Sequence, residues 1–214
     1  MGTKPQKAPA RRRIGILGGT FNPIHNGHLK IAEYALKKFK LDKIIFIPTG
    51  TPPHKPKTNL LDRKTRYALV KQAIEPHKKF EASPIEIKRP GYSFAVDTFS
   101  ILKKKFGART DLFYIMGLDS LTDILNWRQP FRLFDYCEFI VASRPGSSYR
   151  VLRRLMKFPP LQKNADKIHL IELNMRYSST EIRERLKRKK PITALVPSPV
   201  LTYFKKTPAE AFQS

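Results

Sequence analysis

The 214-residue sequence has one cysteine, one tryptophan and only 17 acidic residues. A single thiol has no partner within the chain, so Cys137 forms no internal disulfide; we expect it to pack as a small hydrophobic side chain. No apolar run approaches the ~20 residues needed to cross a bilayer, and the N-terminus lacks the apolar segment of a signal peptide. These absences predict a soluble, cytoplasmic protein without a membrane partner.

Acidic residues are outnumbered by 42 lysines and arginines, which gives a net charge of +25. Such an excess implies anionic partners, either nucleic acid or small anionic substrates drawn into a cleft. The distribution favours neither: residues 1–13 are typical of a disordered basic arm, and residues 183–190 of a solvated helix face. We therefore expect nucleic-acid binding to be nonspecific at most.

Hydrophobic periodicity alternates between strand and helix along the chain, which is typical of a parallel sheet with helices on both faces. The length suits one domain, which we assign to residues 14–207. The expected strands cover residues 14–17, 43–47, 80–87, 112–116, 139–142 and 168–171, and the expected helices residues 27–39, 62–74, 93–106, 120–125, 149–156 and 179–189. We predict an α/β, Rossmann-like doubly wound parallel sheet with a short C-terminal helical appendage. The oligomeric state is left open, a homo-oligomer included.

Residues 18–29 (GGTFNPIHNGHL) follow the first expected strand and form the most informative segment. Gly18 and Gly19 let the backbone approach a ligand closely, and His25 and His28 follow at a His-x-Gly-His spacing. A helix is expected to open between the two histidines, with its N–H groups and positive dipole end near the same place. Together these features predict a site for a polyphosphate, although either feature alone is common in α/β turns.

Residues 48–55 form a proline-rich turn after the second expected strand, and the turn brings His54 and Lys55 to the same end of the sheet. The alternative is a surface loop with a solvated lysine. Ligands of doubly wound sheets bind beyond the carboxyl ends of the strands, so its position favours a role in binding.

Residues 177–183 (YSSTEIR) place small hydroxyl side chains at the start of a helix. Ser178 or Ser179 can cap the helix, while Thr180 and Arg183 share a face and can hold a phosphate together. An ordinary capped helix is the alternative.

Residues 18–29 resemble the signature G-G-T-F-D-P-[IV]-H-x-G-H-L of the nucleotidyltransferase superfamily of adenylyl- and cytidylyltransferases, except that Asn22 stands where the family usually has Asp. Residues 177–183 resemble the [IV]-S-[SA]-T-x-[IV]-R motif of the same superfamily. The resemblance implies contacts with ATP from Gly18, Gly19, Thr20, Phe21, His28, Ser179, Thr180 and Arg183.

Residues 48–55, 86–98, 116–121 and 141–146 resemble segments of the bacterial nicotinate mononucleotide adenylyltransferases, and the likeness covers nearly all of residues 14–205. It implies that Trp127 stacks on the pyridine ring, that backbone N–H groups around Ser93 and Arg128 bind the nicotinate carboxylate, and that Asp119 binds a ribose. It also implies that Asn22 and Lys55 lie on the substrate side and that Arg144 borders the adenine. Without the likeness, Trp127 is a core or interface aromatic and Asp119 a helix cap.

The reaction implied by this resemblance is adenylyl transfer from ATP to nicotinate mononucleotide, a step of NAD biosynthesis that releases pyrophosphate. His25, His28, Lys55 and Arg183 would be the catalytic residues. Mg²⁺ would be held mainly by the ATP phosphates and water, because the sequence offers no cluster of carboxylates for a metal cage.

Three other classes of protein remain as alternatives. Phosphopantetheine adenylyltransferases share the two terminal motifs, although residues 48–55, Asp119 and Trp127 argue against them. A class I aminoacyl-tRNA synthetase fragment would carry the histidine motif, but the sequence has no K-M-S-K-S-like loop. A nonenzymatic nucleic-acid-binding protein would explain the charge and leave both phosphate motifs without a purpose.

Overall fold

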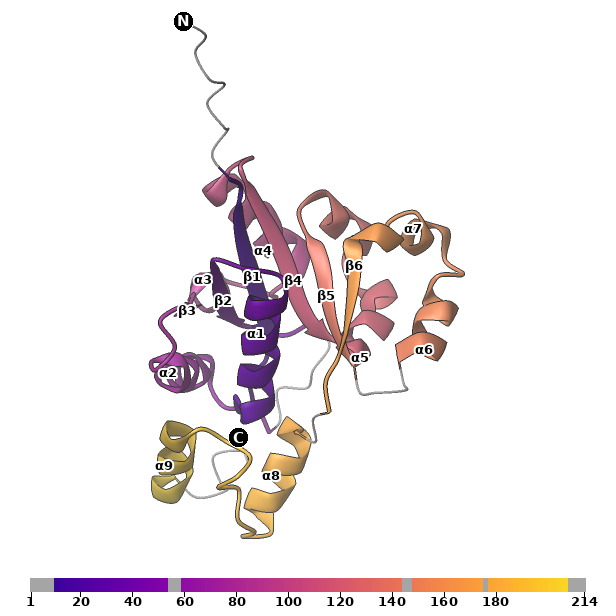
Figure 1. The fold of residues 1–214 in the computed structure, drawn as a ribbon. Coiled ribbons are helices and arrows are strands. Elements are labelled where there is room, and N and C mark those ends of the chain that lie inside the picture. Colours follow the sequence, from indigo (N-terminus) through magenta and orange to yellow (C-terminus); the bar gives the residue numbers. More distant parts are fainter. Residues whose placement is uncertain (1–9, 54–58, 144–147, 175–176, 208–214) are drawn as a thin grey trace, which may run out of the picture.

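The computed structural model describes residues 10–53, 59–143, 148–174 and 177–207. Its centre is a six-stranded sheet whose strands are all parallel and follow the order β3-β2-β1-β4-β5-β6 (Figure 1). The strands are β1 (Arg12–Gly19), β2 (Lys43–Pro48), β3 (Phe80–Ala82), β4 (Thr110–Gly117), β5 (Glu138–Ser143) and β6 (Ile168–Glu172). The strand order reverses between β1 and β4, which is where sheets of this kind bind ligands. The predicted Rossmann-like fold is confirmed.

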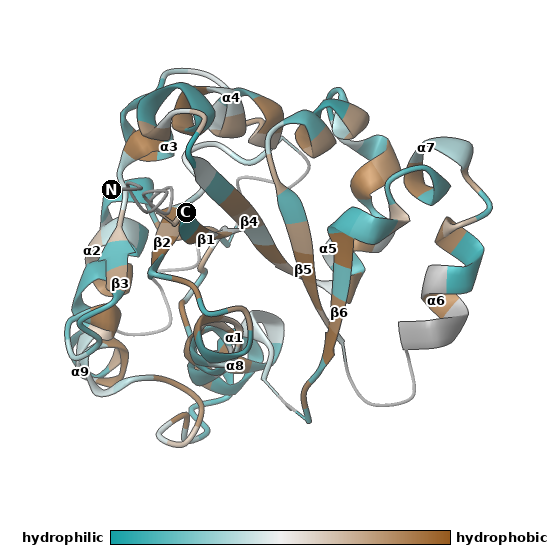
Figure 2. Ribbon diagram, turned by 45° about the horizontal axis from the view of Figure 1, so that its top comes forward, coloured by the Kyte–Doolittle hydropathy of each residue, from teal (hydrophilic) through white to brown (hydrophobic). Residues whose placement is uncertain are grey.

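Helices connect the strands and cover the sheet. The α-helices are α1 (Asn26–Lys38), α2 (Arg63–Ile74), α3 (Ile85–Lys88), α4 (Ala95–Phe106), α5 (Leu118–Thr122), α6 (Ser148–Leu155), α7 (Pro159–Gln162), α8 (Ser179–Lys187) and α9 (Ser198–Lys206). Three short 3-10 helices are η1 (Ile124–Asn126), η2 (Pro130–Asp135) and η3 (Ala165–Lys167). In Figure 2 the sheet lies between α1 on one side and α4 on the other.

Alternating side chains of the strands enter two hydrophobic cores, one on each face of the sheet. In β4, Phe113 and Ile115 join the core under α1, α2, α8 and α9, whereas Leu112 and Met116 join the core under α4 and α5. Both faces are therefore apolar, as expected for parallel strands between two layers of helices. Cys137 lies in the second core and is 6% exposed, and burial raises the pKa of its thiol. Its predicted packing as a hydrophobic side chain is confirmed.

The expected strand over residues 80–87 is wrong in its second half. β3 ends at Ala82, and the chain turns at Pro84 into helix α3. Proline has no N–H to give to the ladder of a strand, whereas it suits the start of a helix. The turn brings the side chain of Glu86 into the interior, where it is 7% exposed.

Two further boundaries differ from the sequence-based expectations. The helix expected over residues 120–125 is split between α5 and η1. The basic arm expected over residues 1–13 also ends earlier, because Arg12 and Arg13 belong to β1 and Arg11 pairs with Asp111 at 2.6 Å. The cause is the pairing of Arg12 and Arg13 with the first residues of β4, which extends the ladder beyond the apolar run. Residues 1–9 lie outside the described residues.

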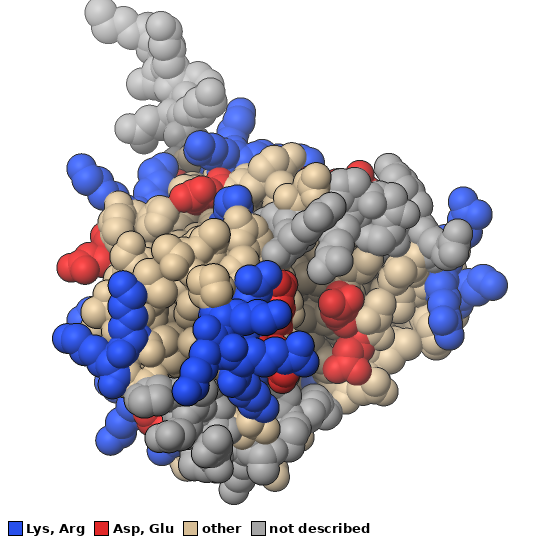
Figure 3. All heavy atoms as spheres, turned by 90° about the horizontal axis from the view of Figure 1, so that it is seen from below, with Lys and Arg blue, Asp and Glu red and all other residues tan. Residues whose placement is uncertain are grey.

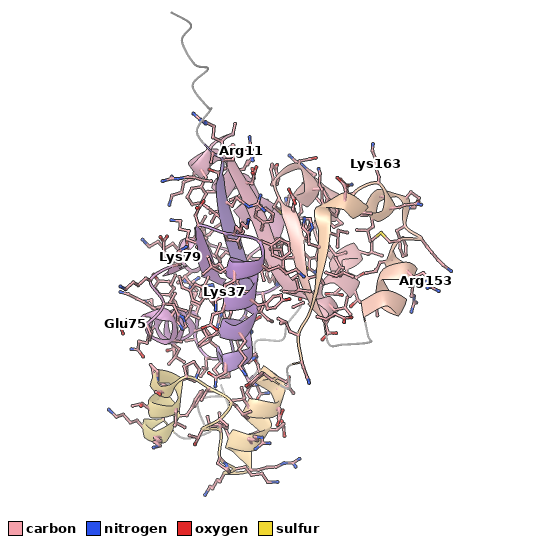
Figure 4. All side chains as sticks on the ribbon, viewed as in Figure 1. Arg11, Lys37, Glu75, Lys79, Arg153 and Lys163 are labelled. Atoms are coloured by element: carbon pink, nitrogen blue, oxygen red, sulfur yellow. The ribbon has the colours of Figure 1, made fainter. Side chains whose placement is uncertain are left out.

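Lysine and arginine side chains lie on several parts of the surface, and some of them also gather at one end of the molecule (Figure 3 and Figure 4). The exposed residues Lys37, Lys79, Arg153 and Lys163 lie on different parts of the molecule (Figure 4). Figure 3 views the end at which α8 and α9 lie, and there Lys and Arg side chains gather near the middle with several carboxylates beside them. Within the described part of the chain, no helix is long and apolar enough to span a membrane.

Candidate active site

A cavity of about 470 Å³ opens at the carboxyl ends of the central strands. It is lined by residues from five segments: the end of β1, the loop after β2, helix α3, the start of α4, and the region from β4 to Arg128. The lining residues are Gly18, Gly19, Thr20, Thr49, Pro52, Pro53, Glu86, Ser93, Phe94, Ala95, Tyr114, Asp119, Ser120, Asp123, Trp127 and Arg128. Seven residues predicted from the sequence thus meet in one cavity at the point where the strand order reverses.

The two histidines lie at the N-terminus of α1, as predicted. His25 is the N-cap residue, with an extended backbone, and His28 is in the first turn. Their rings stack with centroids 3.7 Å apart, and the backbone N–H of His25 donates to Nδ1 of His28 at 3.2 Å. Phe21 meets the ring of His28 edge-on at 4.9 Å. The imidazole of His28 is therefore held on two sides, and its orientation is fixed before a ligand binds.

The hydrogen bond to Nδ1 determines which nitrogen of His28 carries a proton. Because Nδ1 accepts, the proton of a neutral ring is on Nε2, which can donate to a phosphate oxygen. Burial lowers the pKa of His25 to about 4, so this ring is neutral at pH 7. The predicted donor role of His28 therefore depends on the tautomer with the proton on Nε2. The neutral ring of His25 places no positive charge beside it.

Gly27, between the two histidines, is required by close packing. A β-carbon at this position would lie 2.8 Å from the β-carbon of Tyr177 and 3.0 Å from Nδ1 of His25. Any larger residue would push the start of α1 away from the segment before α8. The glycine thus lets the N-terminal and C-terminal motifs touch.

Helix α8 docks directly on the loop between β1 and α1. Arg183 donates to the carbonyl oxygen of Asn22 at 2.9 Å and to the hydroxyl of Thr180 at 3.2 Å. Ser179 donates to the carbonyl oxygen of Pro23 at 3.1 Å, and Ser178 caps the helix. Burial lowers the pKa of Arg183, but a guanidinium remains charged at neutral pH. The two phosphate motifs of the sequence therefore form one continuous cluster.

The start of α1 has fewer available N–H groups than its position suggests. The N–H of Asn26 donates to the carbonyl oxygen of Leu195 at 3.0 Å, and the N–H of His28 donates to that of His25 at 2.9 Å. The expectation that the start of this helix binds phosphates is thus wrong for the His28 N–H, because the tight first turn uses it. The imidazole of His28 remains as its means of contact.

The opposite side of the cavity is aromatic and polar. Trp127 lies 6.1 Å from the ring of Tyr114, and Arg128 stacks over Phe94 at 4.9 Å while its guanidinium lies 3.7 Å from Asp97. Asp119 is an exposed residue in the first turn of α5. The contacts of Trp127 with a pyridine ring and of Asp119 with a ribose, which the resemblance implies, stay predictions.

Two predicted contacts, those of Ser93 and Phe21, need correction in detail, and the side chain of a third residue, Asn22, has partners within the protein. The N–H of Ser93 donates to the carbonyl oxygen of Thr51 at 2.9 Å, so it is engaged within the protein and cannot also bind a carboxylate. The side chain of Phe21 is 2% exposed, which leaves only its backbone for a contact with ATP. The Asn22 amide donates to the carbonyl oxygen of Asn59 at 2.8 Å and accepts from the N–H of Leu61 at 3.0 Å. A substrate contact of Asn22 stays a prediction, since its side chain already joins two loops.

Two predicted site residues, Lys55 and Arg144, lie outside the described residues. Their roles stay predictions from the sequence.

Three residues of the site escaped sequence reasoning as functional candidates. Glu86 lines the cavity, and burial raises the pKa of its carboxyl group, which accepts from the hydroxyl of Thr98 at 2.7 Å. Tyr114 lines the cavity from the middle of β4, and burial raises the pKa of its hydroxyl group. Arg66 lies behind the loops and donates to the carbonyl oxygens of Thr20 and Gly50. Glu86 carried a signal, because it stands in the segment 86–98; the other two look like ordinary strand and helix residues.

An all-parallel sheet with a histidine pair and a hydroxyl–arginine pair at its switch point defines a nucleotidyltransferase site. The model of the family described as cytidylyltransferase-like matches residues 16–185 of the chain. The chain therefore belongs to the cytidylyltransferase-like family.

Similar proteins within this family are named as nicotinate-nucleotide adenylyltransferases. The chain is 42% identical over 196 residues to the probable nicotinate-nucleotide adenylyltransferase of Thermoanaerobacter sp. strain X514, covering 91% of this chain and 92% of the relative. It is 41% identical over 194 residues to the protein of the same name from Moorella thermoacetica, covering 90% and 89%. The resemblance predicted from the sequence is confirmed.

A solved structure has the same fold. Plasmodium falciparum nicotinic acid mononucleotide adenylyltransferase, complexed with NaAD, superposes with a TM-score of 0.74 at 20% identity, covering 91% of this chain and 95% of that one.

Proposed function

We propose that this protein transfers the adenylyl group of ATP to nicotinate mononucleotide, forming nicotinate adenine dinucleotide and pyrophosphate in NAD biosynthesis. The proposal rests on one observation: the cavity and the histidine–arginine cluster meet at the end of β1. Gly18, Gly19 and Thr20 line the cavity that contains Trp127, and the same loop continues into the cluster of His25, His28 and Arg183. A site for a ring-bearing nucleotide thus adjoins a site for polyphosphate. The names of the sequence relatives support the choice of acceptor.

The reaction needs no protein nucleophile. An oxygen of the acceptor 5′-phosphate forms a bond to the α-phosphorus of ATP, and the bond from that phosphorus to the bridging oxygen of the β-phosphate breaks. Pyrophosphate leaves with the electron pair. Catalysis then consists of alignment of the two reactants and stabilisation of the charge in transit on the phosphate oxygens.

The phosphate cluster supplies that stabilisation. Nε2 of His28 would donate to the triphosphate, and the guanidinium of Arg183 would neutralise charge beside Thr180. Because Asn22 already fixes Arg183 through its carbonyl oxygen, little reorganisation is needed as charge develops. We also propose that Lys55 neutralises the acceptor phosphate and that Arg144 borders the adenine, as the sequence predicts.

The acceptor side supplies recognition. The indole of Trp127 would stack on the pyridine ring, and Asp119 would accept from a ribose hydroxyl. The guanidinium of Arg128 is placed to attract the nicotinate carboxylate, although Asp97 lies 3.7 Å from it. Arg128 thus takes over part of the role that the sequence assigns to the backbone near Ser93.

Mg²⁺ fits this site as a companion of ATP. Among the described residues, no group of three or more His, Cys, Asp or Glu side chains could hold a metal ion. The phosphates and water would therefore provide most of its ligands, and the ion would supply additional positive charge. We further propose that the protein works in the cytoplasm, because ATP is its substrate.

The test is pyrophosphate release by the purified protein with ATP and Mg²⁺, with three acceptors offered separately: nicotinate mononucleotide, nicotinamide mononucleotide and 4′-phosphopantetheine. We expect a strong preference for the first. Release only with another acceptor would keep the nucleotidyltransferase and overturn the substrate. No release with any of them would overturn the proposed function.

A further inference from the structure

Arg66 of α2 is a charged side chain that the interior encloses completely. It is 0% exposed, and its guanidinium donates to three main-chain carbonyl oxygens: Leu61 at 3.0 Å from Nε, Thr20 at 2.6 Å and Gly50 at 2.9 Å from the two terminal nitrogens. Three donors in a rigid plane therefore join three separate pieces of backbone.

The charge of Arg66 is not neutralised by direct contact with a carboxylate. The ion pairs in the described part of the chain do not include it. Burial lowers its pKa to about 10, so the side chain is still protonated at neutral pH. The charges of Asp62 and Glu86 favour the protonated form without contacting it. Burial of a charge is nevertheless costly, and an apolar side chain could fill the same volume at less cost. The hydrogen bonds to three carbonyl oxygens, which an apolar side chain cannot make, therefore point to the role of Arg66.

Two of the three acceptors belong to the loops on which the two substrates would lie. Thr20 follows β1 and adjoins the histidine cluster, whereas Gly50 follows β2, next to Thr49 on the cavity wall. Leu61, the third, leads into α2 itself. One side chain thus connects two loops. We call residues 18–29 the donor loop and residues 49–53 the acceptor loop.

The acceptor loop is also fixed from its other side. The N–H of Gly50 donates to the hydroxyl of Ser93 at 3.1 Å, and a β-carbon at Gly50 would lie 2.2 Å from the carbonyl oxygen of Glu86. Gly50 is thus enclosed between Arg66 and the segment that begins with α3. The sheet ladder joins the two loops one residue earlier, where the N–H of Thr49 donates to the carbonyl oxygen of Gly19 at 2.9 Å. With Gly50 stopped on its other side, the guanidinium of Arg66 extends this connection to Thr20 and Gly50.

We propose that Arg66 is a positioning residue: it fixes the donor loop relative to the acceptor loop, and so aligns the acceptor phosphate with the α-phosphorus of ATP. The inference rests on the proposed function, because it places the triphosphate beside the donor loop and the acceptor phosphate beside the acceptor loop, although residues 18–20 also line the cavity that contains Trp127. Arg66 touches neither substrate. Its replacement should therefore affect ligands that span both loops much more than ligands that occupy one.

The experiment compares R66K with the unaltered protein. Lysine keeps the charge but lacks the planar fork, so it cannot reproduce the three bonds. We expect kcat to fall about 100-fold, the effect of a misalignment of about 1 Å. Dissociation constants for a nonhydrolysable ATP analogue and for nicotinate mononucleotide, each measured alone by calorimetry, should change little. Affinity for nicotinate adenine dinucleotide should fall at least about tenfold more than the product of the two separate losses.

Two controls make the result specific. R63K changes an exposed arginine in the first turn of the same helix, and it should behave like the unaltered protein. Thermal unfolding shows whether R66K is folded at the assay temperature; if it is not, R66Q, which keeps an amide donor, replaces it in the same comparison.

A loss of dinucleotide affinity no greater than the two separate losses would overturn the inference, as would an unchanged kcat. The proposed function fails in a different way, when the unaltered protein neither releases pyrophosphate nor binds the dinucleotide.

Discussion

His25 and His28 stack face to face with an angle of 22° between their ring planes, and Nδ1 of His28 receives a hydrogen bond from the backbone N–H of His25. The stack couples a buried neutral ring to one that borders the phosphate cluster. We therefore propose that His25 supports the stack and that His28 is the member of the pair that touches the transferred group.

Replacement of His28 by alanine should lower turnover far more than substrate binding. The loss of one positioned donor to a developing anion typically costs about 10²–10³ in kcat, and we expect that range while the Michaelis constants change little. Steady-state kinetics with both substrates varied would test this. H77A is the matched control, because His77 pairs with Glu33 at the amino end of the sheet. A variant with a raised Michaelis constant and normal kcat would contradict a role in the transition state.

The burial of His25 predicts a loss of stability in acid. Its pKa is about 4 in the folded protein against an ordinary value of 6.5, so the unfolded chain takes up a proton first as the pH falls. The stabilising contribution is complete above pH 6.5 and is lost as the pH falls towards 4. It amounts to about 3 kcal/mol of unfolding free energy.

Urea unfolding of the unaltered protein and of H25N, between pH 4 and 7.5, isolates this contribution. The asparagine cannot be protonated, so the curve of H25N should be shallower over this interval. Parallel curves would show that His25 does not cause the acid sensitivity.

Replacement of Trp127 by alanine should weaken nicotinate mononucleotide selectively. Stacking of an aromatic side chain on a base contributes about 1–3 kcal/mol, so its dissociation constant should rise about tenfold or more while that for ATP stays nearly unchanged. F158A is the matched control, since Phe158 is an exposed aromatic before α7. Equal losses for both substrates in calorimetric titrations would count against stacking.

Asn22 stands where the family usually has aspartate, and the structure predicts the effect of restoring it. In N22D a carboxylate oxygen would face the carbonyl oxygen of Asn59, to which the amide now donates. We expect a loss of about 1–3 kcal/mol of unfolding free energy at pH 7. The difference from the unaltered protein should shrink as the pH falls, because a protonated carboxyl group can donate again.

N164D is the matched control for this change, since Asn164 donates to the carbonyl oxygen of Pro160 at an exposed position. It should cost much less. If N22D is as stable as the unaltered protein at pH 7, the hydrogen bond from the Asn22 side chain to the carbonyl oxygen of Asn59 contributes nothing measurable to the free energy of unfolding.

Local signals in the sequence predicted the parts of the site that depend on local structure. The first helix opens between His25 and His28, and Ser178 caps the helix that carries Arg183, as turn and cap patterns indicate. The parallel sheet followed from the alternation of strand and helix. Such features depend on residues only a few positions apart.

Features that depend on tertiary contacts were not predictable in this way. The engagement of Asn22 by residues 59–61 and the use of the Ser93 N–H by Thr51 involve loops that only the finished fold brings together. Arg66 looks like a solvated helix residue in the sequence, because nothing local shows that three carbonyl oxygens will surround it.

The hydrogen bond from Arg183 to Asn22 joins residues 161 positions apart. Because a ribosome makes the chain from its N-terminus, both histidines emerge long before the guanidinium that completes their cluster. A nascent chain that has just released β1 and α1 holds only the histidines of this cluster. The whole cluster therefore forms only in nearly finished chains, and fragments from interrupted synthesis lack Arg183.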